Sequence, residues 1–222
     1  MVHCLVLFVA AMSTPTASAQ GLIWPEAAPA GAGHGRAVVG VAMEHAYGNA
    51  TVVGGTEGEI GLSETATLGA SAGLLGDDTG SPYGAVEARW LALHREELRL
   101  AIWGLGGAVS SEDLAGAMVG ISADAGTEVV RVDIAIPLYG VGVSEEGDGI
   151  GDTDALLPIH TELGASFIAG DHRIRAGVAR LMPIVGYRYE PRRGFYAGAD
   201  VGAHVFPVGS SYLLSARTGW SF

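Results

Sequence analysis

The stretch VVRVDIAIPL, residues 129–138, alternates apolar side chains with polar or small ones at a period of two. In an extended strand, the apolar residues from Val130 to Ile136 lie on one side, and Arg131 and Asp133 lie on the other. A half-buried strand of a soluble sheet shows the same pattern. The fold is therefore decided by whether this division recurs along the rest of the chain.

The division does recur, in segments of about ten residues, the length that a tilted strand needs to cross a bilayer. A closed barrel of such strands leaves no free strand edge. We predict an all-β fold, an antiparallel transmembrane β-barrel of about twelve strands, within a range of roughly eight to twelve. The expected strands lie near 36–46, 56–63, 66–75, 83–93, 96–106, 113–122, 127–139, 158–168, 172–180, 183–190, 194–205 and 211–222.

The composition supports strands and restricts the function. Glycine accounts for 35 of 222 residues, roughly double its usual share, which penalises helices and suits closely packed strands. Beyond the N-terminus, no apolar run reaches the roughly 18 residues of a membrane-spanning helix. The net charge of −12 argues against a nucleic-acid partner, and all 12 cationic residues are arginines.

The N-terminal residues are predicted to be an export signal. A short apolar core at 5–11 precedes a polar stretch that ends in Ala17-Ser18-Ala19, which fits the specificity of signal peptidase. We therefore expect cleavage before Gln20. The predicted organisation is a signal peptide at 1–19, a periplasmic lead-in at 20–35 and the barrel at 36–222.

The C-terminus carries a resemblance to a known class of proteins. The segment SYLLSARTGWSF, residues 211–222, alternates and ends on phenylalanine, so it resembles the C-terminal signal of bacterial outer-membrane barrels. The stretches EGEIGLSETATLGASAGL (57–74) and PIVGYRYEPRRGFYAGADVGAHVF (183–206) also resemble small, porin-like outer-membrane barrels. The resemblance implies location in the outer membrane, with its lipids and the barrel-assembly machinery as partners. It implies Trp220 and Phe222 as the assembly signal and leaves the oligomeric state open.

The expected connections alternate in length, as short periplasmic turns and longer external loops do in outer-membrane barrels. Short turns are expected at 63–65, 94–95, 124–126, 169–171 and 191–194, and longer connections at 76–82, 109–112 and 140–157. Near the short turns, aromatic residues of the apolar face are expected to form an interfacial girdle. These are Tyr187, Tyr189, Phe195, Trp220 and Phe222.

The polar faces of the strands carry equal numbers of acids and arginines. We predict that they line the lumen as paired charges, because the planar guanidinium takes a carboxylate with two hydrogen bonds. The predicted acids are Glu44, Glu57, Glu59, Glu87, Asp133, Glu162 and Asp200. The predicted arginines are Arg89, Arg99, Arg131, Arg173, Arg175, Arg188 and Arg217. The negative excess falls in the expected external loops, at Asp77, Asp78, Glu112, Asp113, Glu145, Glu146, Asp148, Asp152 and Asp154.

Signals of catalysis or of a cofactor are sparse. His160, Glu162 and Ser166, or Asp200 and His204, lie at even spacing on one strand face, so a hydrolase acting on lipid or peptide is an alternative. Such spacing is common in any polar lumen, and we predict that the protein is not an enzyme. No metal-binding His pair at helical spacing, phosphate loop or dinucleotide fingerprint occurs, so neither a metal nor a cofactor is predicted.

Two non-enzymatic functions fit the predicted barrel. One is a narrow channel or permeability protein, because twelve strands lie between the barrels of about eight strands that side chains fill and the wide porins of about 16 to 18. The other is a closed structural or adhesive barrel whose acidic loops meet external partners. Ionic conductance separates the two.

Overall fold

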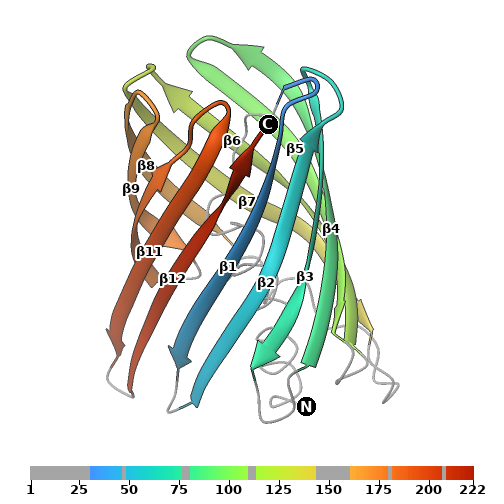
Figure 1. Cartoon of the computed structure of the whole chain (residues 1–222), viewed down its shortest axis with the longest axis vertical. Coiled ribbons are helices and arrows are strands. Elements are labelled where there is room, and N and C mark those ends of the chain that lie inside the picture. Colours follow the sequence, from blue (N-terminus) through green and yellow to red (C-terminus); the bar gives the residue numbers. More distant parts are fainter. Residues whose placement is uncertain are drawn as a thin grey trace.

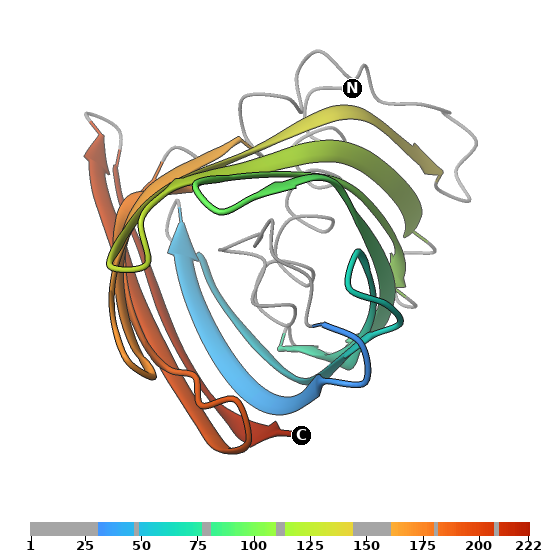
Figure 2. The same ribbon diagram turned by 90° about the horizontal axis from the view of Figure 1, so that it is seen from above.

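The computed structural model describes residues 31–46, 49–76, 81–109, 114–143, 161–179, 182–206 and 209–222. Within them the chain forms a closed barrel of antiparallel strands, each paired with its neighbour in sequence (Figures 1 and 2). The all-β prediction and the count of twelve strands are confirmed. The strands are β1 (Gly35–Ala46), β2 (Asn49–Gly61), β3 (Ala66–Gly76), β4 (Ser81–Arg95), β5 (Leu98–Val109), β6 (Leu114–Gly126), β7 (Val130–Val143), β8 (Glu162–Ala169), β9 (His172–Ala179), β10 (Met182–Tyr189), β11 (Gly194–Phe206) and β12 (Gly209–Ser221).

The barrel closes where β1 pairs with β12, in a register that joins Arg36 to Ser221 and His45 to Tyr212. At the end of this seam, Gly35 and Phe222 exchange two backbone hydrogen bonds, each 2.9 Å long. The start of β1 and the end of β12 therefore lie at the same end of the barrel, together with the short turns (Figure 1). We call this the short-turn end, and the opposite one the long-loop end.

Two short turns lie further along the chain than predicted. The turn after β4 is Glu96-Glu97, because an irregularity between Leu91 and Leu93 shifts the register and lets β4 continue through the expected turn at 94–95. The turn after β6 is 127–129 in place of 124–126. Asp124 stays on the strand, where its carboxylate accepts a hydrogen bond of 2.6 Å from Nε of Arg131 on β7.

Strand β2 begins at Asn49, well before the predicted start at 56. Glycines at 54, 55 and 58 hide the alternation in this segment. The backbone still pairs with β1 along its whole length, from Ala46 opposite Asn49 to Gly35 opposite Ile60. The predicted lead-in at 20–35 reaches the described part of the chain only at 31–35, and the signal peptide lies outside it.

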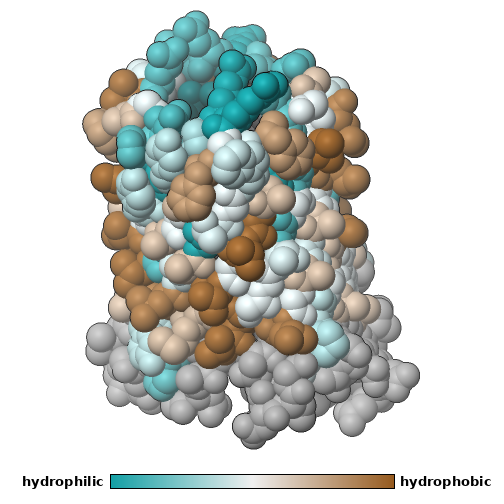
Figure 3. All heavy atoms as spheres, in the orientation of Figure 1, coloured by the Kyte–Doolittle hydropathy of each residue, from teal (hydrophilic) through white to brown (hydrophobic). Residues whose placement is uncertain are grey.

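Each strand has one buried face and one exposed face. On β4, Glu87 is 8% exposed whereas its neighbour on the other face, Val86, is 60% exposed. In a closed barrel the buried face points inward, so the apolar residues lie on the outside, where brown surface dominates the middle of Figure 3. The predicted alternation therefore has the orientation of a membrane barrel and is opposite to that of a soluble sheet packed on an apolar core.

Outward aromatics lie near the short-turn end and, with Tyr139 and Tyr212, also toward the long-loop end. Tyr187, Phe195, Trp220 and Phe222 are exposed, as the girdle requires. Tyr189 is half-buried against the ring of His172, with the two ring centroids 5.2 Å apart. Trp90 and Phe167, which the sequence analysis did not assign to the girdle, are also exposed on the outer face. No helix in the described part of the chain is long and apolar enough to span a membrane.

The orientation of the faces can be tested at Val119, which lies in the middle of β6 and is 47% exposed. Val119→Arg should lower the free energy of unfolding by about 2–4 kcal/mol, because it puts a cation into the hydrocarbon core. Denaturant titration of the barrel in liposomes measures the loss. The control, Glu128→Arg on the exposed turn after β6, should leave stability unchanged. Equal stability of both variants would contradict the assignment of the outer face.

Candidate functional site

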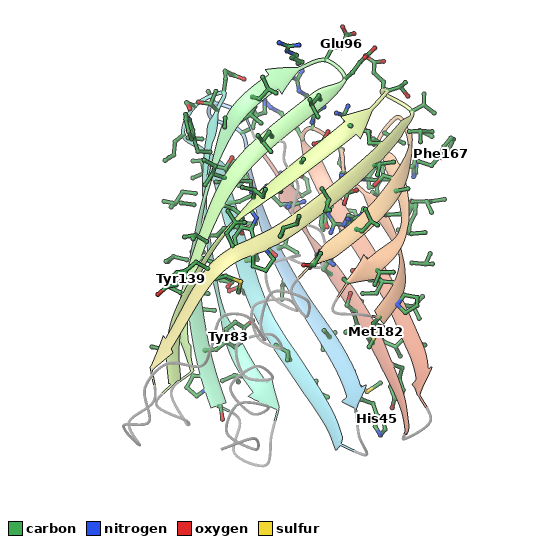
Figure 4. The ribbon with its side chains drawn as sticks, turned by 180° about the vertical axis from the view of Figure 1, so that it is seen from behind. His45, Tyr83, Glu96, Tyr139, Phe167 and Met182 are labelled. Atoms are coloured by element: carbon green, nitrogen blue, oxygen red, sulfur yellow. The ribbon has the colours of Figure 1, made fainter. Side chains whose placement is uncertain are left out.

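The inner face of the barrel divides into two parts along its axis. Toward the short-turn end it carries charged side chains, which we call the charged belt. Toward the long-loop end it carries mostly apolar side chains, which we call the apolar half; Figure 4 shows two of them, Tyr83 and Met182, far from the turn that bears Glu96. The charged belt comprises Arg36, Glu57, Glu59, Glu87, Arg89, Arg99, Asp124, Arg131, Asp133, Arg173, Arg175, Arg188, Glu190, Asp200 and Arg217. The apolar half comprises Ala42, Val53, Tyr83, Ala85, Trp103, Leu105, Met118, Ala135, Ala179, Met182, Ile184 and Leu213.

On β1, β2 and β4, the belt is rich in carboxylates that share two arginines. Arg89 donates to the carboxylate of Glu87 from both Nε (3.1 Å) and Nη2 (2.9 Å). Its Nη2 also lies 3.9 Å from Glu59, whose other oxygen is 3.1 Å from Nη2 of Arg36. Glu57 lines the same small cavity as Glu59 and Glu87. This wall holds the acidic side of the belt.

On β5 to β9, the belt consists of buried pairs. Asp124 accepts from Arg131 and lies 3.9 Å from Nε of Arg99. Arg175 on β9 reaches over β8 to pair with Asp133 on β7. The guanidinium lies where a Cβ on Gly164 of β8 would stand, so a larger residue at this position would displace it.

One carboxylate, from the β10–β11 turn, joins arginines of β1, β9 and β10. Glu190, in the β10–β11 turn, lies 3.4 Å from Nη1 of Arg36, 3.2 Å from Nη1 of Arg188 and 3.9 Å from Nη1 of Arg173. The backbone N–H of Glu190 donates to the carbonyl of Asp171 and fixes the turn. The same carboxylate therefore links three strands at the mouth of the barrel.

Further around this wall, Asp200 pairs with Arg217 and accepts a hydrogen bond of 2.8 Å from Oγ of Ser215. The guanidinium of Arg36 also lies over the ring of Tyr196, 5.0 Å from its centroid. Arg36, on β1, thus contacts β11 and the β10–β11 turn across the seam.

The structure places the residues that were predicted to line the lumen on the buried face of their strands, with one exception. The side chain of Glu44 lies outside the described residues. Glu162 is buried, but it lies in the apolar half, between Ala135 and Ala179 of the neighbouring strands.

Three members of the belt were missed by the sequence analysis. Asp124 and Glu190 were placed in or beside turns, and Arg36 was left out of the charge count. Extending the alternation of β6 by two residues, from Ser122 to Asp124, would have found the first. Nothing local to Glu190 signals its role, because its partners come from distant strands.

In the part of the chain that the structure describes, the candidate catalytic groups do not come together as a nucleophile with a general base. Oγ of Ser166 accepts a hydrogen bond of 3.1 Å from Nε of Arg173, and a guanidinium cannot serve as a general base. Asp200 is engaged by Arg217 and Ser215. The side chains of His160 and His204 lie outside the described residues. Among the residues that the structure describes, no three His, Cys, Asp or Glu side chains are grouped so as to hold a metal ion.

The largest side chains of the apolar half lie flat on glycines. A Cβ on Gly73 would stand 2.8 Å from Cε1 of Tyr83, and one on Gly55 would meet the hydroxyl of the same tyrosine. A Cβ on Gly120 would overlap the indole of Trp103. These glycines let aromatic rings lie along the wall instead of projecting toward the axis.

Comparisons with known proteins bear on the fold. No protein-family model matches the sequence, and no curated protein matches it. Two solved structures of the porin KdgM match 83% of this chain and 99% of theirs at 11% identity, with TM-scores of 0.58 and 0.56. One of them is the KdgM porin in complex with disordered oligogalacturonate.

The chain has the fold of a porin-like outer-membrane β-barrel. This fold supports a location in the outer membrane. Outer membrane phospholipase A from Escherichia coli also matches, at 9% identity over 85% of this chain and 90% of its own, with a TM-score of 0.47. At 11% identity, the likeness to KdgM shows the fold alone.

The junction at Glu190 can be tested by removing its charge. Glu190→Gln should lower the free energy of unfolding by about 1–3 kcal/mol, because three neighbouring arginines lose a charged acceptor. Denaturant titration measures the effect, and Glu96→Gln on the exposed β4–β5 turn is the matched control. If the two variants were equally stable, the carboxylate of Glu190 would not be a structural link.

The glycine beneath Trp103 can be tested in the same assay. Gly120→Ala should cost about 1–3 kcal/mol, because the added methyl overlaps the indole of Trp103 and crowds the backbone carbonyl oxygen of Ile136. The control is Gly54→Ala on the outer face, where the new methyl meets no atom within 4 Å. If Gly120→Ala were as stable as the control, the position of Trp103 would not depend on a glycine at 120.

Proposed function

We propose that this protein is a narrow outer-membrane channel whose charged belt is the constriction. The observation that carries the proposal is the set of inward arginines and carboxylates toward the short-turn end, most of which are held by ion pairs within the belt. Twelve strands enclose more space than the roughly eight whose interior side chains fill. Because large inner side chains lie along the wall on glycines, they take little of that space.

The belt would favour charged solutes over neutral ones. Glu57, Glu59 and Glu87 make the β2–β4 wall acidic, whereas Arg173, Arg175 and Arg188 make the β9–β10 wall basic. These walls lie on opposite sides of the ring of strands (Figure 2). A field directed across the barrel would orient a solute that carries separated charges.

Export and assembly belong to the same proposal. Residues 1–19 would direct secretion, and the strand β12 would present Trp220 and Phe222 to the barrel-assembly machinery. Both side chains are well exposed on the outer face at the short-turn end, at 59% and 48%. Outer-membrane lipid would then cover the girdle that they join.

Planar-bilayer recording tests the channel. The full chain, purified from outer membranes, should show stepwise KCl conductance and a gel mobility that changes on boiling. Arg89→Gln should shift the reversal potential in a KCl gradient toward cation selectivity, because it removes a cation from the constriction. Arg95→Gln, on the exposed end of β4, is the control and should leave selectivity unchanged. A folded barrel without conductance would instead support the closed structural function.

A further inference from the structure

The apolar half carries two clusters of buried hydrophobic side chains on different walls. One, on β9, β10 and β12, consists of Ala179, Met182, Ile184 and Leu213. The other, on β4 to β6, consists of Ala85, Trp103, Leu105 and Met118. The strand order puts the two walls on opposite sides of the barrel. An interior that only has to hold water is polar, as in general porins, so this lining indicates a less polar occupant.

The apolar half also offers a few hydrogen-bond donors. The hydroxyl of Tyr83 and Nε1 of Trp103 are buried, and neither has a hydrogen-bond partner within the described structure. Buried polar groups of this kind are ordinarily satisfied. An apolar wall with a small number of unsatisfied polar groups is the usual lining of a small-molecule site.

On β9 and β10, the inward side chains change from apolar to cationic between one inward-facing residue pair and the next. Met182 pairs with Ala179 and Ile184 with Gly177, whereas the next inward positions pair Gly186 with Arg175 and Arg188 with Arg173. The three arginines line one small cavity together with Gly186. Ala179 lies four positions beyond Arg175, so the wall extends roughly 13 Å from this arginine to the far end of the apolar strip.

We infer that this barrel takes amphipathic carboxylates, with the apolar chain against Met182, Ile184 and Leu213 and the carboxylate at Arg173, Arg175 and Arg188. The inference rests on the proposed channel and names its class of solute. A polyhydroxylated acid fits less well, because its hydroxyls would lose water against the apolar wall without gaining partners. An amphipathic cation fits less well, because the three guanidinium groups outnumber Asp133 and Glu190, the two carboxylates that they pair with.

The test compares four probes on the reconstituted full-length protein. Octanoate carries both features, acetate lacks the chain, octylamine reverses the charge, and glucuronate replaces the apolar chain with hydroxyls. Each is added during KCl recording, and block of the current gives an apparent Kd. Octanoate should block at least about tenfold more tightly than the other three. Octylamine loses the charged hydrogen bonds of the head, and acetate and glucuronate lose the burial of the methylenes, at about 0.8 kcal/mol each.

Two variants separate the head from the tail. Arg188→Gln should weaken octanoate block at least about tenfold. Its control is Arg192→Gln, on the exposed β10–β11 turn. Ile184→Thr should weaken octanoate block and leave acetate unaffected. Its control is Val185→Thr, the adjacent position on the outer face. Mobility shift on boiling confirms that each variant is folded.

The outcomes distinguish this inference from the proposed channel. Conductance in KCl with equal block by octanoate and glucuronate would keep the channel and overturn the solute class, as would equal block by octanoate and octylamine. A barrel that does not conduct would overturn the channel. Calorimetric titration with octanoate would then decide the solute class: binding that Arg188→Gln and Ile184→Thr weaken supports it, and no binding overturns it.

Discussion

The barrel depends on one constraint: within a bilayer, every backbone N–H and C=O must find its partner inside the protein. The pairing of β1 with β12 meets that constraint, because it leaves neither of these strands with a free edge. Once the ring is closed, each strand has a lipid side and an interior side. The alternation of residues 130–136 is the consequence of this geometry, and the charged groups have only the interior in which to lie.

The local features of this fold could be predicted from the sequence, whereas those that depend on register could not. Period-two alternation marks each strand and its two faces, so the strand count and the inward direction of Arg131 and Asp133 follow from local pattern. Strand ends are harder, because the irregularity near Leu91 belongs to a pairing and not to a motif. Ion-pair partners are harder still. Arg175 reaches Asp133 by lying over Gly164 on the strand between them, and no local pattern contains that contact.

The division of the interior explains two compositional oddities together. The belt uses arginine throughout, because each guanidinium presents several donors in one plane and so can join more than one carboxylate, as Arg89 joins Glu59 and Glu87. Glycine is abundant in part because long side chains such as Tyr83 and Arg175 need bare backbone to lie on. The arginines and the glycines together hold large side chains against the wall in defined positions.

The junction at Glu190 also changes how the barrel can come apart. Its contact with Arg36 joins the β10–β11 turn to β1, so the ion pair spans β11, β12 and the seam that closes the ring. A seam held by backbone pairing alone would be the natural place for strands to peel away one at a time. Here peeling β12 from β1 must also break a contact on the inside of the wall, which raises the barrier to opening at that point. The seam is therefore held both by backbone pairing and by an ion pair. A high barrier to opening would keep the barrel folded through a slow rate of unfolding, in addition to its equilibrium stability.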